Sequence, residues 1–109
     1  MKIQIYRKDD YVSVWNLSKS EIADADRLVI FDKNITIRFD YPCDKTEFEF
    51  TNKKGFTNWT LYECIQDGYE RIYAKPKKYG VWGHDIEDLV IDEIKYNPKK
   101  KRVTLFIGS

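Results

Sequence analysis

Apolar and polar residues alternate over much of this chain, and this period of two is the feature that most constrains its fold. Alternation is clearest over residues 2–7, 11–17, 35–39, 46–50 and 102–107. A period of two is typical of β-strands that bury one face and expose the other to water. Half-solvated strands of this kind belong to antiparallel sheets rather than to parallel ones. We therefore expect a sheet assembled mainly from hairpins.

Short polar breaks between these stretches predict three hairpins. They join residues 2–7 to 11–17, 27–31 to 35–39, and 88–96 to 102–107. The breaks contain Asp, Asn or Lys residues, which suit tight turns. Alternation fails at Asp92-Glu93 inside the stretch 88–96, which predicts a β-bulge there.

One stretch has helical periodicity instead. Apolar and aromatic residues recur at spacings of three and four at Trp59, Tyr62, Ile65, Tyr69, Ile72 and Tyr73. This stripe predicts a helix over 58–73, capped by Thr57 or Asn58 and followed by Pro76. Gly68 lies within it, at a cost of about 1 kcal/mol relative to alanine. Ser18 and Glu21 have the spacing of a capping box, which predicts one short turn of helix, with a loop as the alternative.

Length and composition complete the expected fold. The chain has 109 residues, of which 42% are hydrophobic and 16% aromatic, enough for a core without disulfides or a metal. We predict one α+β domain over residues 1–109. It contains a single, strongly curved antiparallel sheet of six or seven strands, with one main helix packed across it.

Charge and cysteine content narrow the function classes. Lys plus Arg number 19 and Asp plus Glu number 18, a net charge of +1, which disfavours a polybasic nucleic-acid domain. One histidine and two cysteines disfavour a metal cluster, and we expect no cofactor. The chain starts without the apolar segment of a signal peptide and contains no membrane-spanning run. These features predict a cytoplasmic protein with Cys43 and Cys64 as free thiols, a disulfide or reactive pair being the alternative.

Catalytic chemistry would have to centre on the one histidine. His84 is followed by Asp85, Glu87 and Asp88, any of which could orient its ring as a general base. A histidine that caps a turn explains the same residues, and we favour it. A Cys64–His84 nucleophile pair is disfavoured, because Cys64 falls in the middle of the predicted helix. The acidic residues match no calcium-binding loop.

Two basic segments offer an alternative function in binding single-stranded nucleic acid. They contain Lys75, Lys77 and Lys78, and Lys99, Lys100, Lys101 and Arg102. Basic side chains near aromatic rings such as Tyr79 hold phosphates and stacked bases. This function requires the two segments to meet on one face, and binding to weaken steeply with salt. The nearly balanced charge argues against it.

Protein binding is the function that we favour. Trp82 stands between Gly80 and Gly83, where we favour a core residue at a turn over an exposed aromatic anchor. Exposed aromatic residues with charged rims are typical of binding hot spots. The candidate contact residues are Tyr79, Trp82, His84, Asp85, Glu87 and Asp88. An exposed Trp82 would support this function, and a buried one would weaken it.

The second half of the chain resembles a group of small proteins. The resemblance rests on residues 79–94, on the ending Leu105-Phe106-Ile107-Gly108-Ser109 and on the helix over 59–73. It is to small uncharacterised proteins of large DNA viruses and some microbes. The resemblance implies an interaction module of viral or mobile-element origin and supplies no catalytic residue.

The expected function is thus a non-catalytic protein-binding module that acts by steric occlusion, as inhibitors, immunity proteins and anti-defence proteins do. Nucleic-acid binding is the second hypothesis, and a small enzyme using His84 with an acid is the third. Self-association through an edge strand is compatible with all three.

Overall fold

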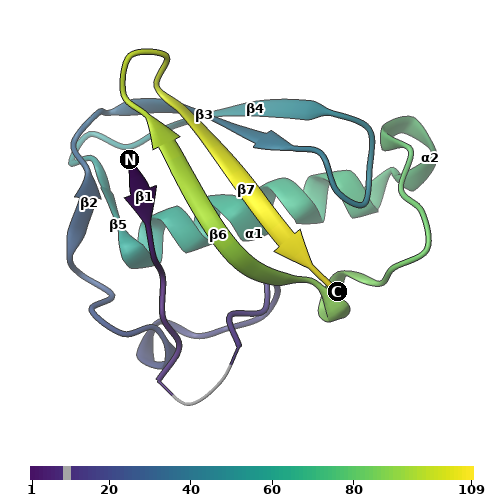
Figure 1. Cartoon of the computed structure of the whole chain (residues 1–109), viewed down its shortest axis with the longest axis horizontal. Helices are drawn as coiled ribbons and strands as arrows, with labels where there is room; N and C mark the ends of the chain where they lie inside the picture. Colours follow the sequence, from purple (N-terminus) through teal and green to yellow (C-terminus); the bar gives the residue numbers. More distant parts are fainter. Residues whose placement is uncertain (9–10) are drawn as a thin grey trace.

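The main helix, α1, spans Asn58–Ala74 and crosses one face of the larger sheet in the computed structural model (Figure 1). The structure describes residues 1–8 and 11–109. Thr57 is the N-cap, because its Oγ1 accepts a hydrogen bond from the Thr60 backbone N–H at 3.0 Å. This bond satisfies one of the N–H groups that a helix leaves free at its start. The predicted helix over 58–73 is confirmed.

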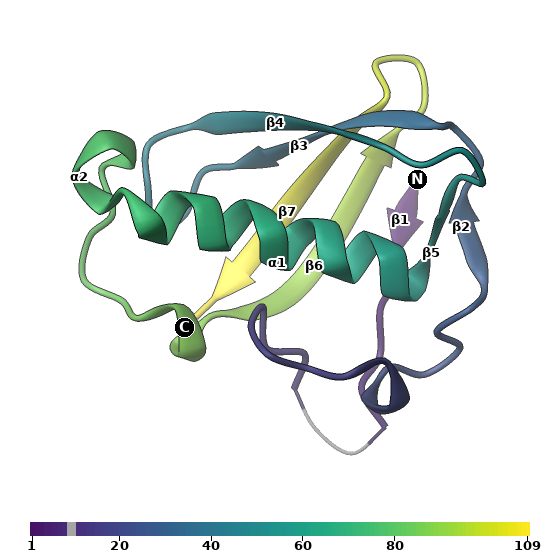
Figure 2. The same ribbon diagram turned by 180° about the vertical axis from the view of Figure 1, so that it is seen from behind.

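The larger sheet has five strands in the order β1-β6-β7-β3-β4. Their bounds are Lys2–Ile3 for β1, Val90–Asn97 for β6, Arg102–Gly108 for β7, Asn34–Phe39 for β3 and Thr46–Thr51 for β4. The central strands β3 and β7 run parallel, whereas all other neighbours are antiparallel. Two hairpins, β3-β4 and β6-β7, therefore lie side by side, and α1 follows the first and packs on the shared sheet (Figure 2).

The predicted α+β class with one main helix is confirmed, but the predicted single antiparallel sheet is wrong. The five-stranded sheet is mixed, and a separate two-stranded sheet pairs β2 (Leu28–Ile30) with β5 (Phe56–Thr57). Residues 27–31 consequently form no hairpin with 35–39. The reason is that β4 and β7 occupy both edges of β3, so no edge is left for β2.

The first predicted hairpin is also wrong. β1 is only two residues long and pairs with β6, where Lys2 lies opposite Lys95. Residues 11–17 form no strand; instead, the Val14 N–H donates to the Leu89 carbonyl at 3.0 Å. Val14 is fully buried, so core burial brings this segment to the start of β6 and away from β1. The predicted turn Lys8-Asp9-Asp10 falls partly outside the described residues.

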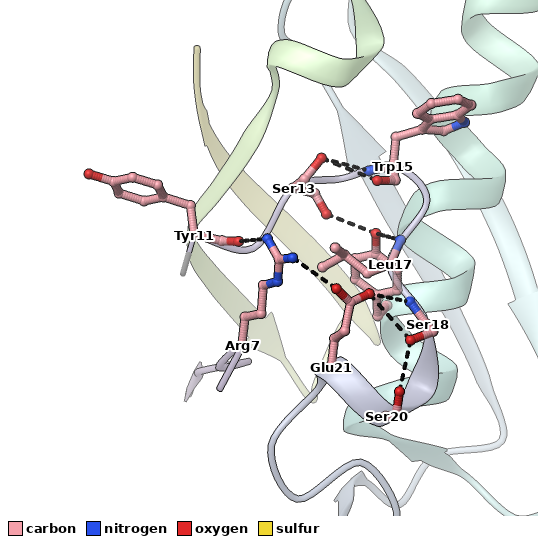
Figure 3. A network of polar contacts seen from close by, with 9 residues as sticks. Arg7, Tyr11, Ser13, Trp15, Leu17, Ser18, Ser20 and Glu21 are labelled. Atoms are coloured by element: carbon pink, nitrogen blue, oxygen red, sulfur yellow. Dashed lines mark hydrogen bonds and ion pairs between the residues drawn. The ribbon is translucent and has the colours of Figure 1, made fainter. Parts of the chain in front are cut away.

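A polar network holds the N-terminal segment against α1 (Figure 3). Glu21 accepts hydrogen bonds from the Arg7 guanidinium and from the Ser18 backbone N–H, both at 2.8 Å. The hydroxyl of Tyr62, on α1, donates to the Ser13 carbonyl at 2.8 Å. The Ser18–Glu21 contact confirms the predicted helical turn at this position.

The third predicted hairpin is confirmed, together with its bulge. β6 and β7 pair antiparallel, and their register shifts between Ile91 and Glu93, next to the break in alternation at Asp92. The extra residue in one strand increases its local twist.

Three short helices complete the chain. They are η1 at Lys19–Glu21, α2 at Pro76–Tyr79 and η2 at Ile86–Asp88. The basic segment with Lys75, Lys77 and Lys78 is therefore partly helical, and α2 contains Lys77 and Lys78. It ends at Gly80, whose φ of +66° favours a glycine. Within the described part of the chain, no helix is both long and apolar enough to cross a membrane.

The core lies between α1 and the larger sheet. The helix buries Tyr62, Ile65, Tyr69 and Ile72, four members of the predicted stripe. Leu61 is also fully buried, whereas Trp59 and Tyr73 are only partly covered. Sheet residues complete this core, foremost Ile35, Ile37, Phe39, Ile94, Val103 and Leu105.

Candidate protein-binding site

Two segments far apart in the sequence meet beyond the end of β3. The chain leaves β3 at Phe39 and passes through Tyr41 and Pro42, while the loop after α2 returns alongside it. The Trp82 N–H donates to the Pro42 carbonyl at 3.0 Å, and the Asp44 N–H donates to the Tyr79 carbonyl at 2.8 Å. These two backbone bonds fix the loop that carries Trp82 against the segment that carries Tyr41.

Three rings form what we call the aromatic cluster: Tyr41, Trp82 and His84. The Trp82 ring stands nearly perpendicular to that of Tyr41, with ring centres 5.5 Å apart, and lies 5.3 Å from that of His84. The Tyr41 hydroxyl is 3.1 Å from His84 Nε2 and 2.9 Å from Ser109 Oγ. Edge-to-face geometry of this kind is a favourable arrangement of aromatic rings. The cluster thus has internal contacts that hold its rings in place.

Two tyrosines of α1 support the cluster from the core. The Tyr69 hydroxyl donates to the Tyr41 carbonyl at 2.7 Å, and the Tyr73 hydroxyl donates to the His84 carbonyl at 2.9 Å. Burial raises the pKa of Tyr73 to about 12 and that of Tyr69 further still, so both hydroxyls remain protonated donors. The backbone under the cluster is therefore anchored to the main helix.

The indole of Trp82 faces solvent, with 55% of its surface exposed. His84 and Tyr41 are half-buried beside it. A core residue at a turn would bury its ring. The Trp82 ring is instead exposed, and its neighbours hold it in place. The favoured prediction of a core position for Trp82 is therefore wrong.

The predicted acidic residues adjoin the cluster along the chain. Asp85 precedes the short helix η2, which contains Glu87 and Asp88, and all three side chains are exposed. Within the described residues, none of these carboxylates forms an ion pair. They leave a negatively charged stretch next to Trp82.

One predicted contact residue, Tyr79, lies elsewhere. Its ring is partly buried and meets the ring of Phe48 edge-on, with centres 6.0 Å apart. Sequence inspection missed Tyr41 and Ser109, which contact the cluster directly. No local pattern in the sequence connects Tyr41 to His84, which lies 43 residues further along the chain.

The two basic segments lie at opposite ends of the molecule (Figures 1 and 2). Lys75, Lys77 and Lys78 lie in or next to α2, whereas Lys99, Lys100, Lys101 and Arg102 lie at the turn between β6 and β7. Arg102 also pairs with Glu47 at 3.0 Å. Nucleic-acid binding would require the two segments to act together, and the structure separates them along the length of the molecule.

The two residues of the disfavoured Cys64–His84 pair lie in different places. Cys64 lines a hollow between β4 and α1 with Phe50, while His84 contacts Tyr41 and Trp82. Burial raises the pKa of Cys64 to about 12 and that of Cys43 to about 11, so both are protonated thiols near neutral pH. Both cysteines are free, as predicted.

Among the described residues, no group of three or more His, Cys, Asp or Glu side chains converges in a way that could hold a metal ion. The acidic stretch at 85–88 thus remains a surface feature.

Comparison with known proteins adds no further assignment, and the resemblance of the second half to small viral and microbial proteins stays a prediction. No protein-family model, no curated protein and no solved structure matches this chain.

Proposed function

We propose that this protein is a non-catalytic binding module that inserts Trp82 into an apolar pocket of a partner protein and acts by covering the partner's surface. The observation that carries the proposal is the exposed Trp82 indole, held by Tyr41 and His84. Tryptophan is among the residues most enriched in binding hot spots.

The support under the cluster favours tight binding. A side chain that is already held loses little conformational freedom when a partner covers it. Trp82 meets this condition through its ring contacts and through the backbone bond from its N–H to Pro42. The expected contact surface is Trp82, His84 and Tyr41.

The negative charge next to Trp82 predicts a positively charged surface on the partner. The unpaired carboxylates of Asp85, Glu87 and Asp88 would face basic groups around the pocket that receives Trp82. Opposite charges at an interface rim mainly accelerate association and select the partner. We therefore expect association that slows as salt rises, with dissociation nearly unchanged.

The test is a comparison of two single variants. Tagged wild-type protein, Trp82→Ala and Phe31→Ala are used to capture partners from a native lysate, with and without nuclease treatment. Phe31 is a matched control, because it is 79% exposed and lies at the other end of the molecule, after β2. We expect a discrete protein that wild type and Phe31→Ala recover and Trp82→Ala does not.

Binding of the purified partner then measures the effect. Loss of a hot-spot tryptophan costs about 2 kcal/mol or more, a roughly 30-fold weaker Kd. Addition of wild-type protein should also reduce the partner's activity, which Trp82→Ala should leave intact at the same concentration. Nuclease-sensitive recovery of nucleic acid, or equal binding by Trp82→Ala, would refute the proposal.

A further inference from the structure

Two strand edges face each other across a groove on the side of the molecule away from Trp82. The groove has a volume of about 340 Å³ and lies between β1, which ends the larger sheet, and β2, which belongs to the smaller one. Its walls include Lys2 and Gln4 on one side and Arg27 and Leu28 on the other. Figure 1 shows β1 and β2 next to each other and running in opposite directions.

The backbone of β1 presents hydrogen-bonding groups to this groove. Met1 and Tyr96 exchange two hydrogen bonds: the Met1 amine donates to Tyr96 O at 3.0 Å and the Tyr96 N–H donates to Met1 O at 2.7 Å. Antiparallel pairs alternate between residues that exchange bonds and residues that do not. Lys2 is therefore the residue whose N–H and C=O point away from β6, toward the groove.

The backbone of β2 also presents hydrogen-bonding groups to the groove, from the opposite wall. The Asn58 N–H donates to the Arg27 carbonyl at 3.0 Å, and Leu28 lies opposite Thr57 in the pairing of β2 with β5. This bond pattern places Leu28 in the non-bonded position of that pair. The N–H and C=O of Leu28 consequently point away from β5, as those of Lys2 point away from β6.

Further along the same edge, the chain already forms such pairing with itself. The Ala23 N–H donates to Tyr6 O at 2.8 Å, and Arg7 and Ile22 form an antiparallel bridge. The chain then turns at Asp24, whose φ is +49°, and continues into β2. The edge that begins at Lys2 is thus able to pair with an extended segment, and the groove begins where the intramolecular pairing stops.

Asn58 lines the groove with a buried side chain. It is only 5% exposed, and its side-chain amide donates to the Asp24 carbonyl at 3.0 Å. Its Oδ1 is buried and accepts no hydrogen bond from the described residues. A buried acceptor without a partner costs about 1–3 kcal/mol.

We propose that this groove binds an extended acidic peptide segment of another protein by strand addition. The peptide pairs antiparallel with β1, continuing the line of residues 21–23, and lies parallel to β2. It thereby joins the two sheets of the protein into one. Strand addition draws affinity from backbone hydrogen bonds and specificity from alternate side chains.

The charged residues that line the groove favour a peptide with acidic side chains. Among the residues that line the groove, the basic ones are Lys2 and Arg27 and the acidic one is Asp24. Lys2 is already paired with Glu93 at 3.1 Å, whereas Arg27 forms no ion pair within the described part of the chain. A carboxylate on the peptide would pair with Arg27 at the groove wall.

The experiment starts from a display library of short random peptides selected on the immobilised wild-type protein. The most enriched sequence is made as a synthetic peptide, and amide hydrogen exchange is measured with and without it. We expect enrichment of Asp and Glu, and exchange of the Lys2 and Leu28 amides slowed about tenfold or more, since both become hydrogen-bonded.

Variants separate the groove from the rest of the surface. Arg27→Glu reverses an exposed charge and should weaken the synthetic peptide's Kd by roughly tenfold or more. Lys77→Glu makes the same kind of change on α2, at the far end of the molecule, and should leave the Kd unchanged. Leu28→Pro removes an N–H that faces the groove and should abolish binding, with circular dichroism as the check on folding.

Three outcomes would overturn the proposal. In the first, the selection enriches no peptide above background. In the second, the selected peptide leaves amide exchange at Lys2 and Leu28 unchanged. In the third, these amides are already protected without peptide because the protein self-associates. The proposal is independent of the function assigned to Trp82, so Trp82→Ala should bind the peptide as wild type does. Failure of one of the two sites leaves the other intact.

Discussion

Phe39 lies directly against the backbone of Gly68, where β3 and α1 cross. A Cβ placed on Gly68 would come within 2.1 Å of Phe39 Cζ, and Phe39 itself is fully buried. Gly68 therefore allows the helix to approach the sheet, and its cost to helix formation is offset by this contact. This contact leads us to expect that a side chain added at Gly68 changes the stability of the protein.

We predict that Gly68→Ala destabilises the protein although alanine is the better helix former. On helix propensity alone the change would gain about 1 kcal/mol. Overpacking against the buried Phe39 ring costs typically about 1–3 kcal/mol, so the free energy of unfolding should fall. Urea unfolding measures it, with exposed Glu63→Ala on the same helix as the control. A rise in stability would show that the ring can move aside.

Removing the hydroxyl of Tyr69 should weaken the support of the aromatic cluster. Tyr69→Phe deletes the bond to the Tyr41 carbonyl and leaves that acceptor unpaired, at a cost of about 1–2 kcal/mol. Urea unfolding tests this, and Tyr6→Phe, at an exposed ring, should change stability by less than about 0.5 kcal/mol. Equal stability of the two variants would mean that the Tyr69 bond is replaceable by water.

Glu21 should make stability depend on pH in the acid range. The Ser18 backbone N–H, followed by Arg7, lowers the pKa of Glu21 below its ordinary value of 4.5. A carboxyl with a lowered native pKa adds stability above its unfolded pKa and loses it as pH falls through the native value. Glu21→Gln should therefore be less stable than wild type at neutral pH, and the difference should shrink below about pH 4.5.

Urea midpoints between neutral and acid pH measure that difference, and Glu63→Gln reports the general effect of losing one exposed carboxylate. A difference between wild type and Glu21→Gln that stays constant over the whole pH range would contradict the prediction.

Both cysteines should react slowly in the native protein. With pKa values raised to about 11 for Cys43 and about 12 for Cys64, very little thiolate is present at pH 8. Labelling by a thiol reagent should be roughly 100-fold or more slower in the native protein than in urea. Single variants Cys43→Ala and Cys64→Ala assign the two rates. Native labelling of Cys64 as fast as in urea would reopen a nucleophilic role for it.

Local patterns were sufficient where neighbouring residues decide the structure. The helix could be predicted to within one residue because its stripe and its Thr57 cap are both encoded nearby. The hairpin β6-β7 was predictable for the same reason, since its turn lies between two adjacent alternating stretches. In the candidate site, Trp82, His84 and the acidic residues could be selected because they are close in sequence.

Pairings between distant segments could not be predicted. Alternation identifies a strand, but every strand offers the same N–H and C=O groups, so it does not identify the neighbour. Residues 27–31 looked like the partner of 35–39, yet β3 pairs instead with β7, some 65 positions away, through contacts such as Thr36 opposite Arg102. Tyr41 was missed in the site for the same reason, because only the returning loop brings Trp82 to it.

The sequence by itself determined the class of this protein, its main helix and the positions of most strands, since period, capping and turn residues act over short distances. Only the tertiary structure decided the mixed sheet, the separate β2-β5 pair, the exposure of Trp82 and the groove beside β1. These features depend on which apolar faces of the strands meet α1, and that choice is made by burial across the whole core rather than by any local stretch.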